Sequence, residues 1–256
     1  MVVDGYQFDA GYQQRLKQAG LRLLWLDDDG LTRRYVADFV LNQNLGASAT
    51  LYADRAPDTQ LLLGPRYVLL RRPFLNWRTW ERKIGPAAKK ILVTLGGSDA
   101  ANVTLRILEA LPRALALEVT VLAGASNPNL ESLQTYCSCT GDRLIVDARN
   151  MPELMAWADL AVSAAGSTTW ELAFMGLPAL LLVLAENQVA AAERLAQAGI
   201  FANLGWHYAG STDLFAERLV ELAGEPTRRE QMSRKGRALV DGRGAERVVK
   251  AMLQCQ

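Results

Sequence analysis

The residues best suited to chemistry in this sequence stand at nine consecutive positions, Ser163 to Glu171, which combine small residues, hydroxyls and one carboxylate. The backbone N–H groups and hydroxyls of Gly166, Ser167 and Thr168 would suit a diphosphate, because the start of a helix attracts anions. Glu171 lies one helical turn beyond Ser167 on the same face, where its carboxylate can accept hydrogen bonds from both hydroxyls of a ribose. The pattern also fits a capping box, in which Ser167 or Thr168 caps the helix and Glu171 folds back. Capping and ligand binding are compatible, so the turn is a candidate ligand site.

A second candidate turn, Gly96-Gly97-Ser98, follows the apolar run Ile91 to Leu95. Its glycines would let backbone N–H groups approach an anion closely, although such a turn also serves plain strand-to-helix packing. The turn lacks the spacing Gly-x-Gly-x-x-Gly, and no acidic residue follows at the distance of a ribose. The sequence therefore disfavours a nicotinamide dinucleotide site.

Two more turns add polar groups directly after strands. The amides of Asn187 and Gln188 follow the apolar run 179–184 and could meet a polar ligand, or Asn187 simply caps the next helix. Residues 147–152 contain Asn150 and Met151, whose backbone could hydrogen-bond a flat base or form an ordinary loop. In an open α/β sheet, ligands bind beyond the carboxyl ends of the strands, so these turns are the ones to examine.

The elements that must position these turns are regular from Lys89 onward. Continuously apolar strands alternate with helix-period stretches, which predicts a parallel sheet covered on both faces, a doubly wound α/β domain. Pro128 would stand in the first turn of one of the helices. The expected strands are 91–95, 117–123, 144–146, 160–163, 179–184 and 200–204, and the expected helices are 103–111, one from Asn127-Pro128 onward, 151–158, 167–175, 188–197 and two after Pro226.

The first 75 residues are typical of part of a second domain of the same class. We expect strands at 2–3, 21–26 and 39–41 and a helix at 11–19. Because the chain opens directly in a strand, this N-terminal domain is expected to be incomplete. We therefore predict a GT-B-like pair of doubly wound parallel-sheet domains, divided into residues 1–75, a linker at 76–88, a nucleotide-sugar-binding domain at 89–240 and a C-terminal helix at 241–256.

Charge and hydropathy exclude several classes of protein. The 28 basic and 27 acidic residues are mixed along the chain and leave a net charge of +1, so we expect no nucleic-acid partner. Arg71 and Arg72, beside aromatic residues, are interpreted as a solvated turn. The longest apolar run, Leu177 to Ala185, is far shorter than the roughly 20 residues of a membrane helix. The first residues do not have the pattern of a secretory leader, so we do not expect one. We expect a cytoplasmic protein without membrane insertion.

Cysteine and histidine usage argues against a metal site. The sequence has three cysteines and one histidine, His207. Cys137 and Cys139 are too close to bridge comfortably, which favours reduced thiols. With a lone histidine and no second cysteine pair, zinc is not expected, and we interpret His207 as an incidental loop residue.

The order of the four turns is more specific than any one of them. It resembles the C-terminal domain of GT-B glycosyltransferases of the MurG type. The chain is more similar still to the PseG family, the UDP-2,4-diacetamido-2,4,6-trideoxy-β-L-altropyranose hydrolases of pseudaminic acid biosynthesis. The segments that carry the resemblance are 96–98, 150–155, 163–171 and 186–188, with 3–9, 41–46, 63–70, 94–99 and 241–245 in addition.

This resemblance implies that the C-terminal domain binds UDP. Water would attack the anomeric carbon of the bound sugar, UDP would leave, and the free sugar would pass on to nonulosonic acid synthesis. Neither a metal nor a cofactor is required. By matching positions, Gly97 and Gly166 to Thr168 would meet the phosphates, Glu171 the ribose and the Asn150-Met151 backbone the uracil, while Gly96, Ser98 and Gln188 complete the predicted substrate-binding set.

The chain departs from the family pattern near its N-terminus. The family's Gly-x-Gly-His-x-x-Arg loop, whose histidine activates water, is absent, and His207 does not match it. Tyr6, with Asp4 behind it, and Asn187 match polar residues of the family's sugar site and are the catalytic candidates. Tyrosine has a reference pKa of about 10 and an amide does not titrate, so neither is a strong base at neutral pH. We expect UDP binding to be retained, whereas the sequence leaves open whether hydrolysis is retained. A GT-B glycosyltransferase with a UDP-sugar donor, and a non-catalytic UDP-binding remnant, stay open as alternatives.

Overall fold

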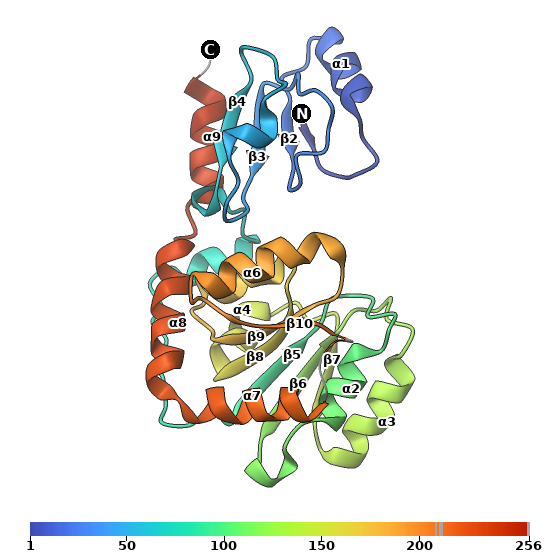
Figure 1. Cartoon of the computed structure of the whole chain (residues 1–256), viewed down its shortest axis with the longest axis vertical. Coiled ribbons are helices and arrows are strands. Elements are labelled where there is room, and N and C mark those ends of the chain that lie inside the picture. The colour runs from blue at the N-terminus through green and yellow to red at the C-terminus, as the bar shows by residue number, and fades with distance from the viewer. Residues whose placement is uncertain (208, 210–211, 255–256) are drawn as a thin grey trace. The chain divides into compact units, whose positions relative to one another are not determined.

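A computed structural model of the chain describes residues 1–207, 209 and 212–254. By contacts the chain divides into two compact units, Arg71–Leu239 and the combination of Met1–Leu70 with Val240–Gln256, and Figure 1 shows the elements of each. Sequence analysis had placed residues 71–75 with the first domain and treated 241–256 as a separate helix. The contacts instead group 71–75 with the larger unit and the C-terminal helix with the smaller one.

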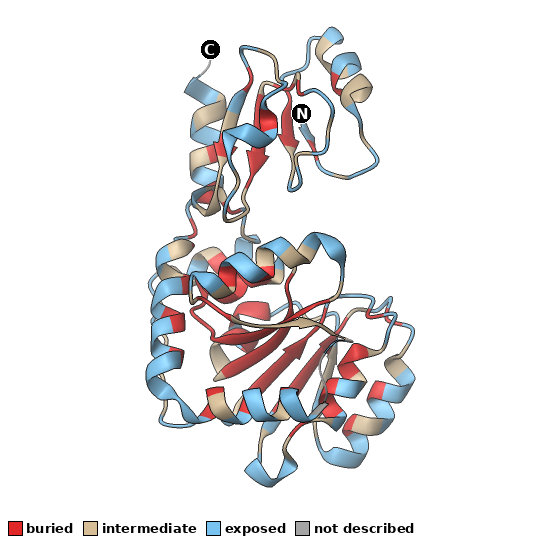
Figure 2. Cartoon of the chain, in the orientation of Figure 1, coloured by how far each residue is buried: buried red, intermediate tan, exposed pale blue. Residues whose placement is uncertain are grey.

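The larger unit is built on a six-stranded parallel sheet with the strand order β10-β9-β8-β5-β6-β7. Every residue of β8 and β9 is buried, as expected of strands covered on both faces (Figure 2). The strands are β5 (Lys90–Thr94), β6 (Glu118–Ala123), β7 (Arg143–Val146), β8 (Leu160–Ala164), β9 (Ala179–Val183) and β10 (Ala202–Trp206).

Helices cover both faces of this sheet. On one face α2 contacts α3 and α7, and on the other α4, α5 and α6 connect the remaining strands (Figure 1). This confirms the doubly wound α/β domain predicted from the alternation of strands and helices. The helices are α2 (Val103–Glu109), α3 (Leu130–Thr140), α4 (Met151–Trp157), α5 (Thr168–Phe174), α6 (Val189–Gln197), α7 (Thr212–Gly224) and α8 (Pro226–Leu239).

The order of the strands reverses beside β5. The chain runs from β5 to β6 and β7 on one side, then returns through α4 to β8, β9 and β10 on the other side. The connections that leave β5 and β8 therefore diverge, and a crevice for ligands opens at such a reversal in doubly wound sheets.

Residues 76–88, predicted as a linker, pack into the larger unit through Arg82. Its guanidinium donates to Ala158 O at 2.6 Å, to Met155 O at 2.5 Å and to Met175 O at 3.2 Å. These carbonyls belong to the C-terminal ends of α4 and α5, which a cation stabilises because helix C-termini carry partial negative charge. Burial lowers the pKa of Arg82 to about 10, so the arginine stays protonated at neutral pH and holds the two helix ends together.

The smaller unit contains a four-stranded parallel sheet with the order β1-β2-β3-β4. Apolar residues of β2, β3 and β4 form a core with Val248 of the C-terminal helix α9. Because α9 covers one face of this sheet, the two ends of the chain fold together. The elements are β1 (Val2–Val3), α1 (Ala10–Gln18), β2 (Leu24–Leu26), β3 (Phe39–Asn42), β4 (Gln60–Leu63) and α9 (Gly244–Gln254).

Two elements were absent from the sequence prediction, and one helix begins later than expected. The strand β4 and the helix α7 had not been predicted. The helix α3 begins at Leu130 with Asn129 as its N-cap, so Pro128 precedes the helix instead of standing in its first turn. The side chain of Asn127 accepts the N–H of Asn129 at 2.8 Å, which forms a local turn where the helix was expected.

Candidate functional site

The loops that follow β5 and β8 lie side by side at the strand reversal. Thr94 of β5 pairs with Ser163 of β8, so the turns 96–98 and 166–168 leave adjacent strands at the same level. The structure thus brings together the two turns that sequence analysis assigned to the phosphates.

Backbone donors are available at both turns. Within the part of the chain that the structure describes, the N–H groups of Gly97, Ser98, Gly166 and Ser167 have no acceptor. Gly96, Gly97 and Ser98 are exposed, and no atom lies within 4 Å of the place where a Cβ on either glycine would stand. Open, unpaired N–H groups on neighbouring strand ends are the arrangement that binds an anion.

The β5 turn passes close to the end of β6. A Cβ on Gly124 would lie 2.5 Å from Gly97 O and 2.8 Å from Gly97 Cα, so only glycine fits at residue 124. Asp99, in a left-handed conformation at φ 34°, accepts the N–H groups of Val103 and Thr104 at 2.8 Å each. The aspartate thereby caps α2 and fixes the far end of the turn.

A side-chain amide from the loop after β9 lies beside the β8 turn. Gln188 Oε1 accepts the N–H of Leu184 at 2.9 Å, which leaves the amide nitrogen as a donor. A Cβ on Gly166 would stand 3.7 Å from that nitrogen. Gln188 therefore adds a donor beside Gly166, whereas its neighbour Asn187 is exposed within the short 3-10 turn Glu186–Gln188.

Glu171 has a partner that sequence analysis missed. Arg71 donates from Nε to Oε1 at 2.6 Å and from Nη2 to Oε2 at 2.9 Å, and this pairing raises the pKa of the Arg71 guanidinium. Arg71 had been interpreted as part of a solvated turn with Arg72; its side chain is indeed exposed, but it also pairs with Glu171, which that interpretation did not include. Ser167 makes no capping hydrogen bond, and Thr169 Oγ1 donates to Gly166 O at 2.7 Å. The capping box, in which Glu171 would fold back, does not form.

Asn150 and Met151 also lie at the carboxyl ends of the strands, but three strands away from the β8 turn. They begin α4 after β7, which β5 and β6 separate from β8. With strands about 4.8 Å apart, roughly 14 Å of sheet lies between the ends of β7 and β8. Asn150 is exposed and Met151 is buried. Asp147 accepts Ala125 N at 2.8 Å and so ties the end of β7 to that of β6.

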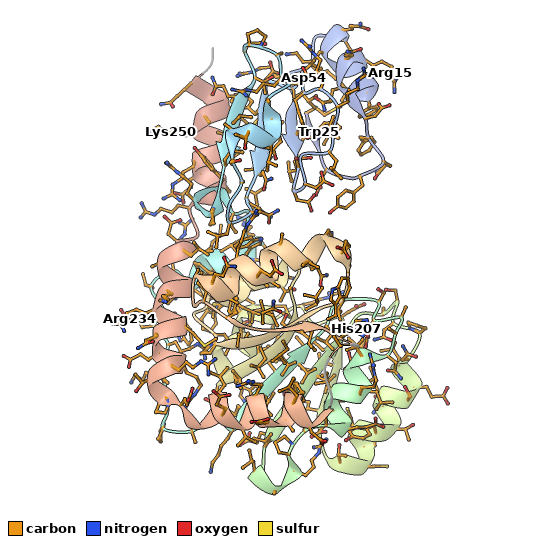
Figure 3. The ribbon with its side chains drawn as sticks, viewed as in Figure 1. Arg15, Trp25, Asp54, His207, Arg234 and Lys250 are labelled. Carbon is orange, nitrogen blue, oxygen red and sulfur yellow. The ribbon has the colours of Figure 1, made fainter. Side chains whose placement is uncertain are left out.

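His207 lies at the end of β10 beside an apolar cavity of about 70 Å³, and Figure 3 labels it. Its Nδ1 accepts from Arg106 Nη2 at 2.8 Å, because an arginine can only donate. Burial and the nearby Arg106 charge lower the pKa of His207, so the imidazole is neutral at pH 7. None of the predicted ligand residues lines this cavity, and the candidate site rests on the open turns instead.

Tyr6 belongs to the smaller unit, where its hydroxyl donates to Asp28 Oδ2 at 2.5 Å. The tyrosine is 71% exposed. Burial raises the pKa of the neighbouring Asp27, whose Oδ2 accepts from Tyr52 at 2.8 Å. Sequence analysis named Asp4 behind Tyr6 and did not foresee the role of Asp28.

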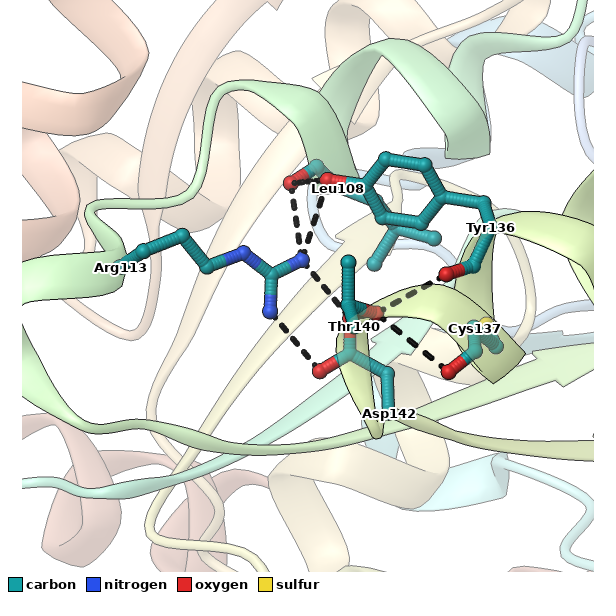
Figure 4. Close-up of polar contacts among 6 residues, drawn as sticks. All are labelled: Leu108, Arg113, Tyr136, Cys137, Thr140 and Asp142. Atoms are coloured by element: carbon teal, nitrogen blue, oxygen red, sulfur yellow. Dashed lines mark hydrogen bonds and ion pairs between the residues drawn. The ribbon is translucent and has the colours of Figure 1, made fainter.

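A separate polar cluster lies at the other end of the strands of the large sheet, just before β6 and β7 begin (Figure 4). Arg113 binds both oxygens of Asp142, at 2.9 and 2.7 Å, and Tyr136 donates to Leu108 O at 2.9 Å. The pairing with Asp142 raises the pKa of Arg113. The cluster borders a hollow of about 600 Å³. Because these groups satisfy one another, we interpret the cluster as structural.

Metal ligands do not gather in the described part of the chain. Across residues 1–207, 209 and 212–254, no three His, Cys, Asp or Glu side chains could jointly hold a metal ion. Cys137 and Cys139 are free thiols, as predicted, and burial raises the pKa of Cys137 to about 11. The third cysteine, Cys255, lies outside the described residues.

None of the helices described combines the length and apolar character needed to cross a bilayer.

Comparison with known proteins identifies the family. The model of the glycosyltransferase family 28 C-terminal domain matches residues 91–248, more than half of the chain. The chain belongs to this family. The family 28 match contains the turns after β5, β8 and β9 and the start of α4, so every predicted substrate-binding residue falls within it.

Individual relatives and structures agree with this family 28 assignment. The chain is 28% identical to the spore coat polysaccharide biosynthesis protein SpsG of Bacillus subtilis, over 77% of this chain and 59% of SpsG. It is 26% identical to the UDP-2,4-diacetamido-2,4,6-trideoxy-β-L-altropyranose hydrolase of Campylobacter jejuni, over 78% of this chain and 71% of the hydrolase. MurG of Acinetobacter baumannii superimposes with a TM-score of 0.65 at 16% identity, over 99% of this chain and 72% of MurG.

These matches confirm the predicted GT-B-like fold class, with a parallel sheet in each of two units. The chain spans from 40% to 71% of the length of the first three curated relatives that it matches.

Proposed function

We propose that this protein binds a UDP-sugar at the strand ends of its larger unit and hydrolyses it to free sugar and UDP. The substrate proposed is a UDP-linked 2,4-diacetamido-2,4,6-trideoxy sugar of nonulosonic acid biosynthesis. One observation carries the proposal: unpaired backbone donors at Gly97, Ser98, Gly166 and Ser167 lie on adjacent strand ends at the strand reversal.

Binding would use one class of group for each part of the nucleotide. The backbone N–H groups of the β5 and β8 turns, with the amide of Gln188, would hold the two phosphates. Glu171 would accept from the ribose hydroxyls, and the backbone at Asn150 and Met151 would meet the uracil. The roughly 14 Å between the ends of β7 and β8 requires an extended ligand, and a nucleoside diphosphate has that shape.

The reaction would break the bond between the anomeric carbon and the oxygen of the β-phosphate. Water forms the new bond to carbon, the electron pair of the broken bond stays on the phosphate oxygen, and the proton of the water is released. The backbone donors of the β5 and β8 turns would stabilise the charge that develops on the leaving UDP. Tyr6, whose hydroxyl is bound by Asp28, and the exposed amide of Asn187 are the groups proposed to orient the water and the sugar.

The relatives supply the support for this choice of substrate. The Campylobacter jejuni hydrolase and a bifunctional Helicobacter pylori protein carry the altropyranose hydrolase name, at 26% and 25% identity. Sequence segments in both units contribute to the resemblance, which favours the hydrolase over a protein that shares only the nucleotide-binding half.

A UDP-sugar glycosyltransferase is the second candidate. The family is named for glycosyltransferases, and the N-acetylglucosamine transferase of Hahella chejuensis is 32% identical over 66% of this chain. In that case an acceptor hydroxyl would take the place of water. A UDP-binding protein without turnover is the third candidate, because the two proposed catalytic side chains, a phenol and an amide, are not strong bases at neutral pH.

Incubation of the protein with the UDP-sugar, followed by NMR of the products, tests the proposal. Hydrolysis predicts free sugar and UDP in equal amounts without any acceptor. Product that forms only when an acceptor is added would select the transferase instead. Calorimetry with UDP completes the test, because binding without turnover in either assay indicates the non-catalytic protein, and no binding contradicts the proposed site.

A further inference from the structure

We propose that Arg71 is a positioning residue that orients the Glu171 carboxylate toward the ribose of the bound nucleotide. The inference rests on the proposed function, since it requires that Glu171 meets a ribose. Arg71 itself is not proposed to touch the ligand. Its role is to fix the plane and the direction of the carboxylate that does.

The contact between the two side chains is a two-point contact. Arg71 Nε lies 2.6 Å from Glu171 Oε1, and Nη2 lies 2.9 Å from Oε2. Two parallel hydrogen bonds between planar groups fix their relative orientation, which one bond would leave free to rotate. A lysine could not reproduce this, because an ammonium group is a point charge without a fork.

The arginine is itself held in place. Its guanidinium carbon lies 5.5 Å from the centre of the Phe74 ring, and Phe74 is buried against Phe174 of α5, with ring centres 6.3 Å apart. Glu171 lies on the same helix as Phe174. The aromatic pair thus anchors the arginine to the helix that carries the carboxylate.

The pairing leaves Glu171 able to bind a ligand. An ionised carboxylate offers about four lone-pair sites, and a two-point contact with arginine occupies two of them. The remaining two match the two hydroxyls of a ribose. The Glu171 side chain is 11% exposed and the Arg71 side chain 56% exposed. The carboxylate is therefore covered over most of its surface, and any ligand must approach it from one direction.

The contact between Arg71 and Glu171 also joins segments that are distant in the sequence. Arg71 is the first residue of the larger unit, directly after Leu70 of the smaller unit. Arg71 and Glu171 are 100 residues apart in sequence. The Glu171 carboxylate is thus bound by the first residue of the larger unit, from a distant part of the sequence.

Calorimetry with two ligands, UDP and 2′,3′-dideoxy-UDP, separates this role from a direct contact with the phosphates. The proteins compared are the wild type, Arg71→Gln, Arg71→Lys and the matched control Arg72→Gln, which changes the exposed neighbour. The wild type should bind UDP about 10-fold more tightly than the dideoxy analogue, the scale of a hydrogen bond to a charged group. Arg71→Gln should remove most of that preference without weakening the analogue, and Arg71→Lys should restore only part of it. Arg72→Gln should behave as the wild type.

Other outcomes overturn the proposal in distinct ways. Equal weakening of both ligands by Arg71→Gln would place Arg71 on the phosphates or the base. An unchanged UDP affinity in that variant would remove its role altogether. If the wild type binds both ligands equally well, the nucleotide site stands and the ribose contact of Glu171 fails. If the wild type binds neither ligand, the proposed function fails first. Thermal unfolding checks that each variant is folded, and Arg71→Lys, which keeps the charge, provides the comparison if Arg71→Gln is not.

Discussion

At the scale of single residues, the sequence pattern predicts which side chains could meet a nucleotide but not which residues contact those side chains. Glu171 was predicted from its spacing to Ser167, and the structure does place it in the first turn of α5. Its contact with Arg71 spans 100 residues of sequence. Local spacing carries no information about such a contact, because tertiary packing alone brings the two segments together.

Replacing Glu171 by alanine should weaken UDP binding. The change removes the proposed acceptor of the ribose hydroxyls and leaves Arg71 without its carboxylate, so a loss of about 1–3 kcal/mol is expected. Isothermal calorimetry measures the loss. The control is Glu131→Ala, which removes an exposed carboxylate from the first turn of α3. A UDP affinity equal to that of the control would exclude Glu171 from the site.

The imidazole of His207 should titrate below its reference pKa of 6.5. Burial is the larger cause and the Arg106 charge the next, so Arg106→Gln should move the pKa part of the way back. The chain has one histidine, so a single imidazole signal reports it in an NMR titration. Because the unfolded chain binds this proton more tightly, the free energy of unfolding should fall as pH drops below about 6.5. His207→Gln should remove that part of the pH dependence, and a pKa at or above 6.5 would contradict the burial argument.

At the scale of elements, strands with two covered faces were predictable and elements with mixed exposure were not. The continuous apolar runs of β8 and β9 indicated buried strands, and both are buried throughout. β10 was expected at 200–204 but spans Ala202–Trp206, and all of its residues are only partly buried. β4 was missed because its short apolar run ends at Gly64-Pro65, where the sequence favours a turn. Element order could be predicted from the pattern, whereas the exact ends depend on neighbours.

Gly124→Ala should disturb the β5 turn that carries Gly97. The added Cβ would meet Gly97 O at 2.5 Å, and backbone cannot move aside as a flexible side chain can. We expect a loss of about 1–3 kcal/mol in the free energy of unfolding, as for other overpacked sites, together with weaker UDP binding. Denaturant unfolding and calorimetry measure the two effects. Gly224→Ala is the control, because a Cβ there meets nothing within 4 Å. Equal behaviour of the two variants would mean that the turn has room to relax.

At the scale of the whole molecule, the last residues of the chain, Val240–Gln256, belong to the same unit as the first 70 residues. Sequence periodicity predicted a helix after Gly244 but could not assign it to the sheet of residues 1–70, because the assignment depends on contacts between the two ends of the chain. Val248 of α9 packs with Leu24, Phe39, Leu41 and Leu62. Because the two ends of the chain pack into one unit, we expect the two units to unfold separately.

Gly244→Ala should destabilise the smaller unit selectively. A Cβ on Gly244 would overlap backbone atoms of Tyr67 and Val68, so α9 could no longer approach this closely. We expect faster hydrogen exchange at the amides of β3 and unchanged exchange at those of β9. The control is Lys250→Ala on the exposed side of the same helix. Equally faster hydrogen exchange in β3 and β9 would show that the two units unfold together.

The central claim is that the ends of β5 and β8 bind the diphosphate of UDP, and an NMR titration of nitrogen-15-labelled protein with UDP tests it most directly. The account predicts saturable shifts of the backbone amide signals of Gly97, Ser98, Gly166 and Ser167. The amide signal of Thr140, which lies near the start of β7 at the other end of the strands, should not shift. Saturable shifts confined to other parts of the chain, or no shift at these four amides at saturating UDP, would contradict it.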